Sequence, residues 1–176
     1  MRIALPLAAS LLICSAIACA QSETQAEPSE ASLVLELGGT ASRSITENNS
    51  SFGPSFAAEI EPLENKLEIE AGASSLFRRH STEWDVDVLF KKPWTLSEKV
   101  EFMIGAGPAW IHSRAYGTET TDSAGLEIEP EFMIWRSESH RFGWYVEPTY
   151  EYNFGAGHEQ SLAVTVGLLI GFHRSK

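Results

Sequence analysis

The chain has 176 residues, the length of one domain, and its 24 Asp and Glu against 13 Lys and Arg give a formal net charge of −11. So acidic a chain repels nucleic acid, and no basic patch in the sequence argues otherwise, so we expect no nucleic-acid partner. Both cysteines, Cys14 and Cys19, lie near the N-terminus, which leaves the rest of the chain without disulfides or thiol catalysis.

Residues 1–20 have the pattern of a secretory signal peptide. The positive charge of Arg2 precedes an almost wholly apolar run, and small residues flank Cys19 at the end of it. We expect cleavage after Ala20; lipidation of Cys19 is the alternative. The polar, acidic stretch 21–31 predicts a short disordered lead-in.

From Ser32 onward apolar and polar residues alternate with a period of two, and no helical stretch of useful length occurs. The strands expected in chain order are 33–38, 56–61, 67–73, 83–90, 100–110, 126–134, 142–152 and 161–172. Such a series predicts an all-β fold over 32–176: an eight-stranded antiparallel up-and-down β-barrel, which closes and so leaves no sheet edge.

The connections between these strands alternate in length. The longer ones, expected at one rim, are 41–54, 75–82, 113–123 and 153–159, and the shorter ones, expected at the other, are 62–65, 92–99 and 136–141. Pro108, Pro130 and Pro148 fall within strands, where each removes a ladder hydrogen bond and predicts a bulge or kink.

The alternation defines two faces of the barrel but leaves open which one points outward. The apolar face carries most of the aromatic residues, which are Trp84, Phe90, Phe102, Trp110, Phe132, Trp144, Tyr150 and Phe172. The polar face carries a series of carboxylates: Glu36, Glu59, Glu68, Glu70, Asp85, Asp87, Glu101, Glu127, Glu129, Glu131, Glu147 and Glu151. A soluble, lipocalin-like barrel turns its apolar face inward, and a transmembrane barrel turns it outward.

The aromatic residues lie toward the strand ends and favour the transmembrane type. The carboxylates argue against it, because acids crowded in a narrow lumen must stay protonated or find cations. The basic residues that could be drawn inward are Lys66, Lys91, Arg78 and Arg79.

The last predicted strand has a polar residue, a glycine two positions on, and large apolar residues three and five positions further, at Thr165, Gly167, Ile170 and Phe172. This pattern resembles the C-terminal recognition strand of outer-membrane β-barrels, although four residues follow the aromatic here. From about Ser32 to Phe172 the chain resembles small barrels of the OmpA/OmpX-like type. The resemblance implies a monomer in the bacterial outer membrane, surrounded by its lipid and delivered by periplasmic chaperones and the barrel-assembly machinery.

Little in the sequence points to chemistry. His112 and Ser113 with Glu151 or Asp85 form a weak candidate for a catalytic site of the lipid-modifying kind, without a recognisable signature. No His-x-His pair, phosphate loop or dinucleotide motif occurs, so we predict no metal site and no cofactor.

These patterns favour an outer-membrane barrel with a structural, surface-anchoring or interaction role and no catalysis. Two alternatives stay open: a periplasmic lipocalin-like barrel that binds an apolar ligand, and a lipid-modifying outer-membrane enzyme.

Overall fold

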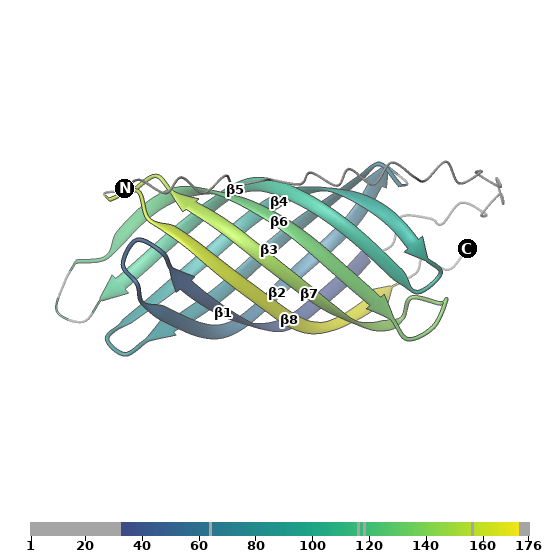
Figure 1. Cartoon of the computed structure of the whole chain (residues 1–176), viewed down its shortest axis with the longest axis horizontal. Helices are drawn as coiled ribbons and strands as arrows, with labels where there is room; N and C mark the ends of the chain where they lie inside the picture. The colour runs from purple at the N-terminus through teal and green to yellow at the C-terminus, as the bar shows by residue number, and fades with distance from the viewer. Residues whose placement is uncertain (1–32, 64, 116, 118, 156, 173–176) are drawn as a thin grey trace, which may run out of the picture.

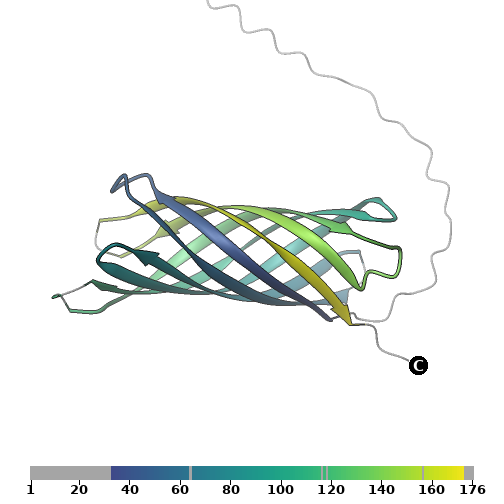
Figure 2. The same cartoon turned by 90° about the horizontal axis from the view of Figure 1, so that it is seen from below.

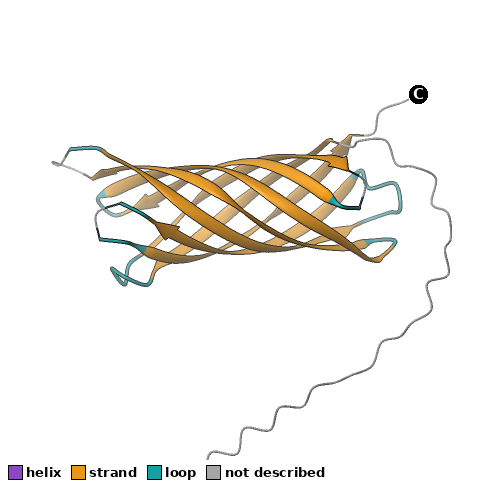
Figure 3. Cartoon of the chain, turned by 90° about the horizontal axis from the view of Figure 1, so that it is seen from above, coloured by secondary structure: helices purple, strands orange, loops and turns teal. Residues whose placement is uncertain are grey.

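The computed structural model describes residues 33–63, 65–115, 117, 119–155 and 157–172. The predicted signal peptide (1–20) and lead-in (21–31) lie outside these residues. The described residues form strands and connections without a helix (Figures 1 and 3). The strands are β1 Leu33–Ser44, β2 Ser50–Leu63, β3 Leu67–Arg78, β4 Ser81–Ser97, β5 Val100–Ala115, β6 Thr121–Trp135, β7 Phe142–Asn153 and β8 Gln160–Phe172. Within the described part of the chain, no helix is long and apolar enough to cross a membrane.

Each strand pairs antiparallel with the next, and β8 pairs with β1, so the sheet is a closed barrel in sequence order. Figure 2 shows β1 and β8, at the two ends of the colour scale, side by side where the barrel closes. A hydrogen bond of 2.8 Å between the hydroxyls of Thr40 and Thr165 crosses this seam on the inner face. The predicted eight-stranded up-and-down barrel is confirmed.

The two rims of the barrel differ less than the sequence predicted. We call the rim that carries connections 45–49, 79–80, 116–120 and 154–159 the loop rim. We call the opposite rim the terminal rim; it carries connections 64–66, 98–99 and 136–141, the start of β1 and the end of β8. The prediction of long loops was wrong because polar stretches such as Ser50 to Pro54 continue the strands. Strand pairing is made by the backbone, so it does not require apolar side chains near a rim.

The strand prolines are accommodated without bulges. Pro130 and Pro148 lie opposite each other between β6 and β7, where the ladder lacks partners, yet the register is the same on both sides of the gap. Pairing between β4 and β5 lapses likewise near Pro108 without a shift. The predicted loss of ladder pairing is confirmed, and the predicted bulge at these prolines is wrong.

The apolar face points outward. Apolar side chains in the middle of the strands, such as Leu37, Ile128 and Val166, are almost half exposed, while the neighbouring carboxylates Glu36 and Glu129 are buried. A lipocalin-like interior that could hold an apolar ligand is therefore excluded, because the inward face of these strands carries acids. The question that the alternation left open is settled by the way the sheet closes.

Aromatic side chains gather on the outer face near both rims. Toward the terminal rim, Trp94, Phe102 and Phe132 form a ladder across β4, β5 and β6, with ring centroids 5.7 Å and 4.7 Å apart. Toward the loop rim, Trp84 on β4 and Trp110 on β5 are exposed. Two aromatic belts of this kind are typical of barrels whose ends meet the interfaces of a lipid bilayer.

The interior is apolar near the terminal rim. Met103, Met133, Trp135, Tyr145 and Leu169 are buried there against one another. Because an eight-stranded barrel is narrow enough for side chains to fill, this cluster closes the lumen at that end. The polar part of the interior therefore lies between this cluster and the loop rim.

Candidate functional site

The middle of the barrel holds a layer of carboxylates around one lysine. We call this layer, formed by Glu36, Glu59, Glu70, Lys91, Glu129, Glu131 and Glu147, the central layer; all its members are buried. The ammonium Nζ of Lys91 lies 2.7 Å from Glu131 Oε2, 2.8 Å from Glu129 Oε1 and 3.9 Å from Glu147 Oε2. It also contacts Glu70 Oε2. Lys91 thus neutralises part of the negative charge that the carboxylates bring into the lumen.

A glycine on the neighbouring strand makes room for this lysine. Lys91 on β4 pairs with Gly105 on β5. A Cβ atom at Gly105 would lie 2.5 Å from Lys91 Cγ, closer than any real contact allows. The absence of a side chain at Gly105 therefore lets the stem of Lys91 cross the lumen.

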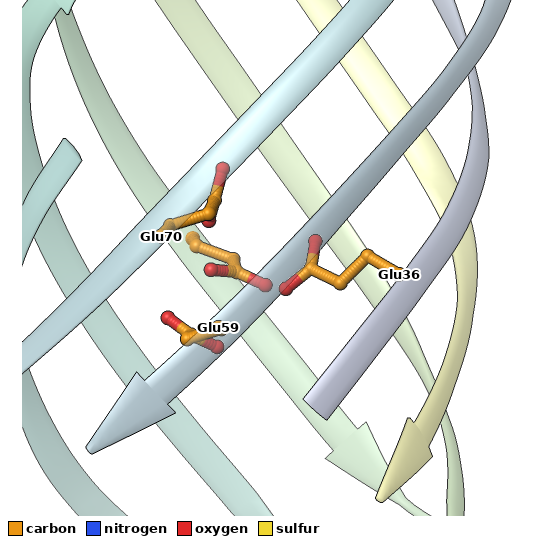
Figure 4. A group of neighbouring side chains, drawn as sticks. Glu36, Glu59 and Glu70 are labelled. Atoms are coloured by element: carbon orange, nitrogen blue, oxygen red, sulfur yellow. The ribbon is translucent and has the colours of Figure 1, made fainter. Parts of the chain in front are cut away.

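Glu36 and Glu59 differ from the other acids of the central layer. Their side chains are 0 % and 1 % exposed, and neither oxygen of either carboxylate has a hydrogen-bond partner among the described residues. Figure 4 shows Glu36, Glu59 and Glu70 reaching the same region of the interior from β1, β2 and β3. In this group each of Glu36, Glu59, Glu70 and Glu131 offers one oxygen, and these oxygens lie within 4.8 Å of one another.

Two further carboxylate sets occur in the interior. One consists of Glu70, Glu129, Glu131 and Glu147, the four acids that Lys91 contacts. The other consists of Asp85, Glu127 and Glu151, on β4, β6 and β7 nearer the loop rim. We call this second set the upper trio. A cavity of about 60 Å³ connects the upper trio with the central layer, because its lining includes Glu36 and Glu70 as well as all three acids of the trio. Such a volume is enough for water or a small ion.

The remaining acids predicted for the lumen, Glu68, Asp87 and Glu101, are partly buried. Glu101 accepts a hydrogen bond of 3.4 Å from the Trp135 indole, and its other oxygen lies 3.5 Å from His140 Nδ1. His140 in turn stacks on Trp135 with ring centroids 4.9 Å apart. Glu101 therefore belongs to the closure at the terminal rim.

The basic residues expected to relieve the acids take different places. Lys91 lies at the centre of the interior, although the expected connection 92–99 begins directly after it in the sequence. Arg78 lies at the loop rim within 4 Å of Glu47, Glu83 and Glu159. Arg79 is exposed and is therefore not drawn inward.

The candidate catalytic residues are not brought together. His112 follows Trp110 on the outer face, and its Nδ1 lies 2.8 Å from Asp122 Oδ1 across the β5–β6 ladder. Glu151 lines the interior cavity. Ser113 pairs with Thr121 and Glu83 in the register and has no hydrogen bond to His112 among those of the described residues. A His–Ser–carboxylate arrangement is therefore not present among these side chains.

The residues of the predicted assembly signal occupy both faces of β8. Thr165 and Gly167 are buried on the inner face, and Phe172 is exposed on the outer face at the strand's end. Gly167 pairs with Tyr145, and a Cβ atom there would lie 2.4 Å from the tyrosine ring. The glycine of this pattern is therefore required by the close approach of an aromatic ring.

These features define a closed eight-stranded barrel with an apolar exterior, aromatic belts and a charged interior, which is the fold of small outer-membrane β-barrels. Neisserial surface protein A has this fold, with a TM-score of 0.65 at 11% identity over 81% of this chain and 97% of that one. OprG from Pseudomonas aeruginosa matches with a TM-score of 0.62 at 11% identity, over 81% of this chain and 96% of that one.

Ail, the attachment invasion locus protein of Yersinia pestis, was solved in complex with the heparin analogue sucrose octasulfate. It matches with a TM-score of 0.56 at 14% identity, over 81% of this chain and 99% of that one. No protein-family model and no curated protein sequence matches the chain. At these identities the likeness concerns the fold alone.

Proposed function

We propose that this protein is a bacterial outer-membrane barrel with a structural or surface-interaction role, and that it presents its short loop-rim connections outside the cell. The observation that carries the proposal is the outer face, where apolar side chains cover the middle of all the strands and aromatic ones lie near both rims. A soluble protein rarely exposes so large an apolar surface. A closed barrel, in which every strand pairs with two neighbours, is one of the two kinds of structure that can cross a bilayer.

In this proposal the monomer is surrounded by outer-membrane lipid, and periplasmic chaperones and the barrel-assembly machinery deliver it. Membrane fractionation tests it. The protein should stay with the outer-membrane fraction through a high-salt or alkaline wash and require detergent for extraction. Recovery in the osmotic-shock fluid without detergent would contradict the proposal.

A second candidate function, recognition of a sulfated or phosphorylated glycan, is favoured by a basic hollow at the loop rim. Arg79 and His80 from the β3–β4 connection and Arg114 from β5 line this hollow beside Arg78. The linear sequence hides this patch because Arg114 is far from Arg78, Arg79 and His80 in the chain. Ail in complex with the heparin analogue sucrose octasulfate supplies a precedent on the same fold.

Heparin-agarose retention in detergent tests this second candidate. Arg79→Gln combined with Arg114→Gln should abolish retention, whereas Arg136→Gln at the terminal rim should leave it unchanged. Equal elution of all three proteins would rule the candidate out.

A further inference from the structure

We propose that the barrel interior binds a Ca²⁺ ion between Glu36, Glu59, Glu70 and Glu131, next to the ammonium group of Lys91. The site is built by four strands: Glu36 comes from β1, Glu59 from β2, Glu70 from β3 and Glu131 from β6. This set exists only in the closed barrel, because β1 and β6 are far apart in the chain.

Two adjoining carboxylate sets in the interior share Glu70 and Glu131 but differ in their contacts with Lys91. In one set the ammonium of Lys91 lies among all four acids and serves as their cation. In the other set, Glu36 and Glu59 contact no cationic side chain within the described residues. The lysine thus serves all four acids of one set but only the two shared acids of the other.

A second feature of the set with Glu36 and Glu59 is the burial of its unpartnered oxygens. Glu36 and Glu59 are 0 % and 1 % exposed, and all four of their carboxylate oxygens lack hydrogen-bond partners among the described residues. A buried ionised carboxylate without a partner is strongly destabilising. A divalent cation removes this cost, because it supplies two positive charges and coordinates several oxygens at once.

The type and number of the ligands favour Ca²⁺ over Mg²⁺. The ligand oxygens lie within 4.8 Å of one another. Oxygens this close together can all coordinate one Ca²⁺ ion at about 2.4 Å. Calcium also accepts cages made wholly of carboxylates with irregular geometry, and Mg²⁺ usually keeps several waters.

The interior also offers a route to this site. The cavity of about 60 Å³ is lined by Glu36 and Glu70 at its deep end and by Asp85, Glu127 and Glu151 nearer the loop rim. A row of acids along a narrow passage raises the local cation concentration. The apolar cluster around Met103 and Tyr145 closes the terminal side, so the ion enters from the loop rim.

Protons are the competing occupants of these oxygens. Glu68 lies beside Glu59, and a proton between these two carboxyls would give Glu59 the partner that it lacks when both are ionised. Calcium uptake at pH 8 distinguishes the two occupants. A site that holds only protons takes up no Ca²⁺, whereas a calcium site binds the ion and releases any protons that it holds.

The test is a Ca²⁺ titration of the protein folded in detergent at pH 8. Binding is measured by calorimetry and by equilibrium dialysis with ⁴⁵Ca²⁺. We expect one Ca²⁺ per barrel, with at least tenfold weaker affinity in Glu36→Gln and in Glu59→Gln. Glu138→Gln, which changes an exposed acid in the β6–β7 connection, is the matched control and should bind as the parent does. Each variant is checked for the gel shift of a folded barrel; removing a buried charge should leave folding intact.

A second readout is the temperature at which the barrel unfolds on a gel. Calcium should raise this temperature relative to EDTA in the parent and in Glu138→Gln, but not in the Glu36→Gln/Glu59→Gln double variant. Failure of the parent to bind Ca²⁺, or binding that the double variant retains, would overturn the proposal. Equal affinity for Mg²⁺ would overturn the choice of ion.

Discussion

Replacing Lys91 by methionine should strongly destabilise the barrel. The side chain is fully buried, and its ammonium lies 2.8 Å or less from the carboxylates of Glu129 and Glu131 and contacts Glu70 as well. Methionine fills a similar volume without the charge. The substitution therefore removes the cation and leaves its acids crowded in a medium of low dielectric constant.

The expected magnitude follows from the number of partners. Removing one member of a buried ion pair costs about 3–5 kcal/mol, because the other charge stays buried and uncompensated. Lys91 serves several carboxylates at once, so we expect a loss near the upper end, about 5 kcal/mol. Adding Glu70→Gln and Glu131→Gln to Lys91→Met should restore more than half of the loss, since both acids then no longer need a cation.

The measurement is urea unfolding in detergent micelles, followed by the fluorescence of the chain's five tryptophans. Lys66→Met, at an exposed position in the β2–β3 connection, is the control and should change the free energy of unfolding by less than about 0.5 kcal/mol. A loss below about 1 kcal/mol for Lys91→Met, or no recovery in the triple variant, would refute the argument.

Three further predictions concern the outer face, assembly and packing. Ile128→Arg, near the middle of β6 on the outer face, should cost about 2–4 kcal/mol of folding free energy in a bilayer; equal stability would count against lipid contact. Phe172→Ala should lower the yield of barrel assembled in cells more than Phe56→Ala does, because only the first changes the predicted assembly signal; equal yields would contradict it. Gly105→Ala should cost about 1–3 kcal/mol in urea unfolding, because the added Cβ displaces the buried lysine, whereas Gly39→Ala, with 3.8 Å to its nearest neighbour, should cost less than about 1 kcal/mol. Similar losses at both glycines would refute this explanation.

The number of strands and the division of their residues into two faces followed directly from the alternation of residues, since successive side chains of a strand point to opposite sides. The strand ends did not follow. β1 continues through Arg43 and β2 begins at Ser50, in a stretch that the sequence assigned to a loop. Polar residues near a barrel rim can face water on both sides and still pair through their backbones, so their composition resembles that of a loop.

The candidate site was predicted in part. The acids of the central layer were recognised as members of one face, but nothing local distinguished Glu36 and Glu59, which lack partners, from Glu129 and Glu131, which contact Lys91. The useful signal was the position of Lys91 in β4. Asp87, Leu89 and Lys91 occupy every second position, so the lysine shares the inner face with them. Its neighbours Lys92 and Pro93 made the stretch look like a turn.

By itself the sequence determined that the chain alternates into eight amphipathic strands with acids on one face and aromatic residues on the other, because the pleat of a strand has a period of two. Only the tertiary structure decided which face points outward, since alternation is the same for either sense of closure. Closure also decided which acids meet, because it brings β1 and β6 to one interior and fixes their levels through the register of the ladders between them. Interactions across the lumen join residues that no local sequence pattern connects. The partners of Lys91 could therefore be identified only from the tertiary structure.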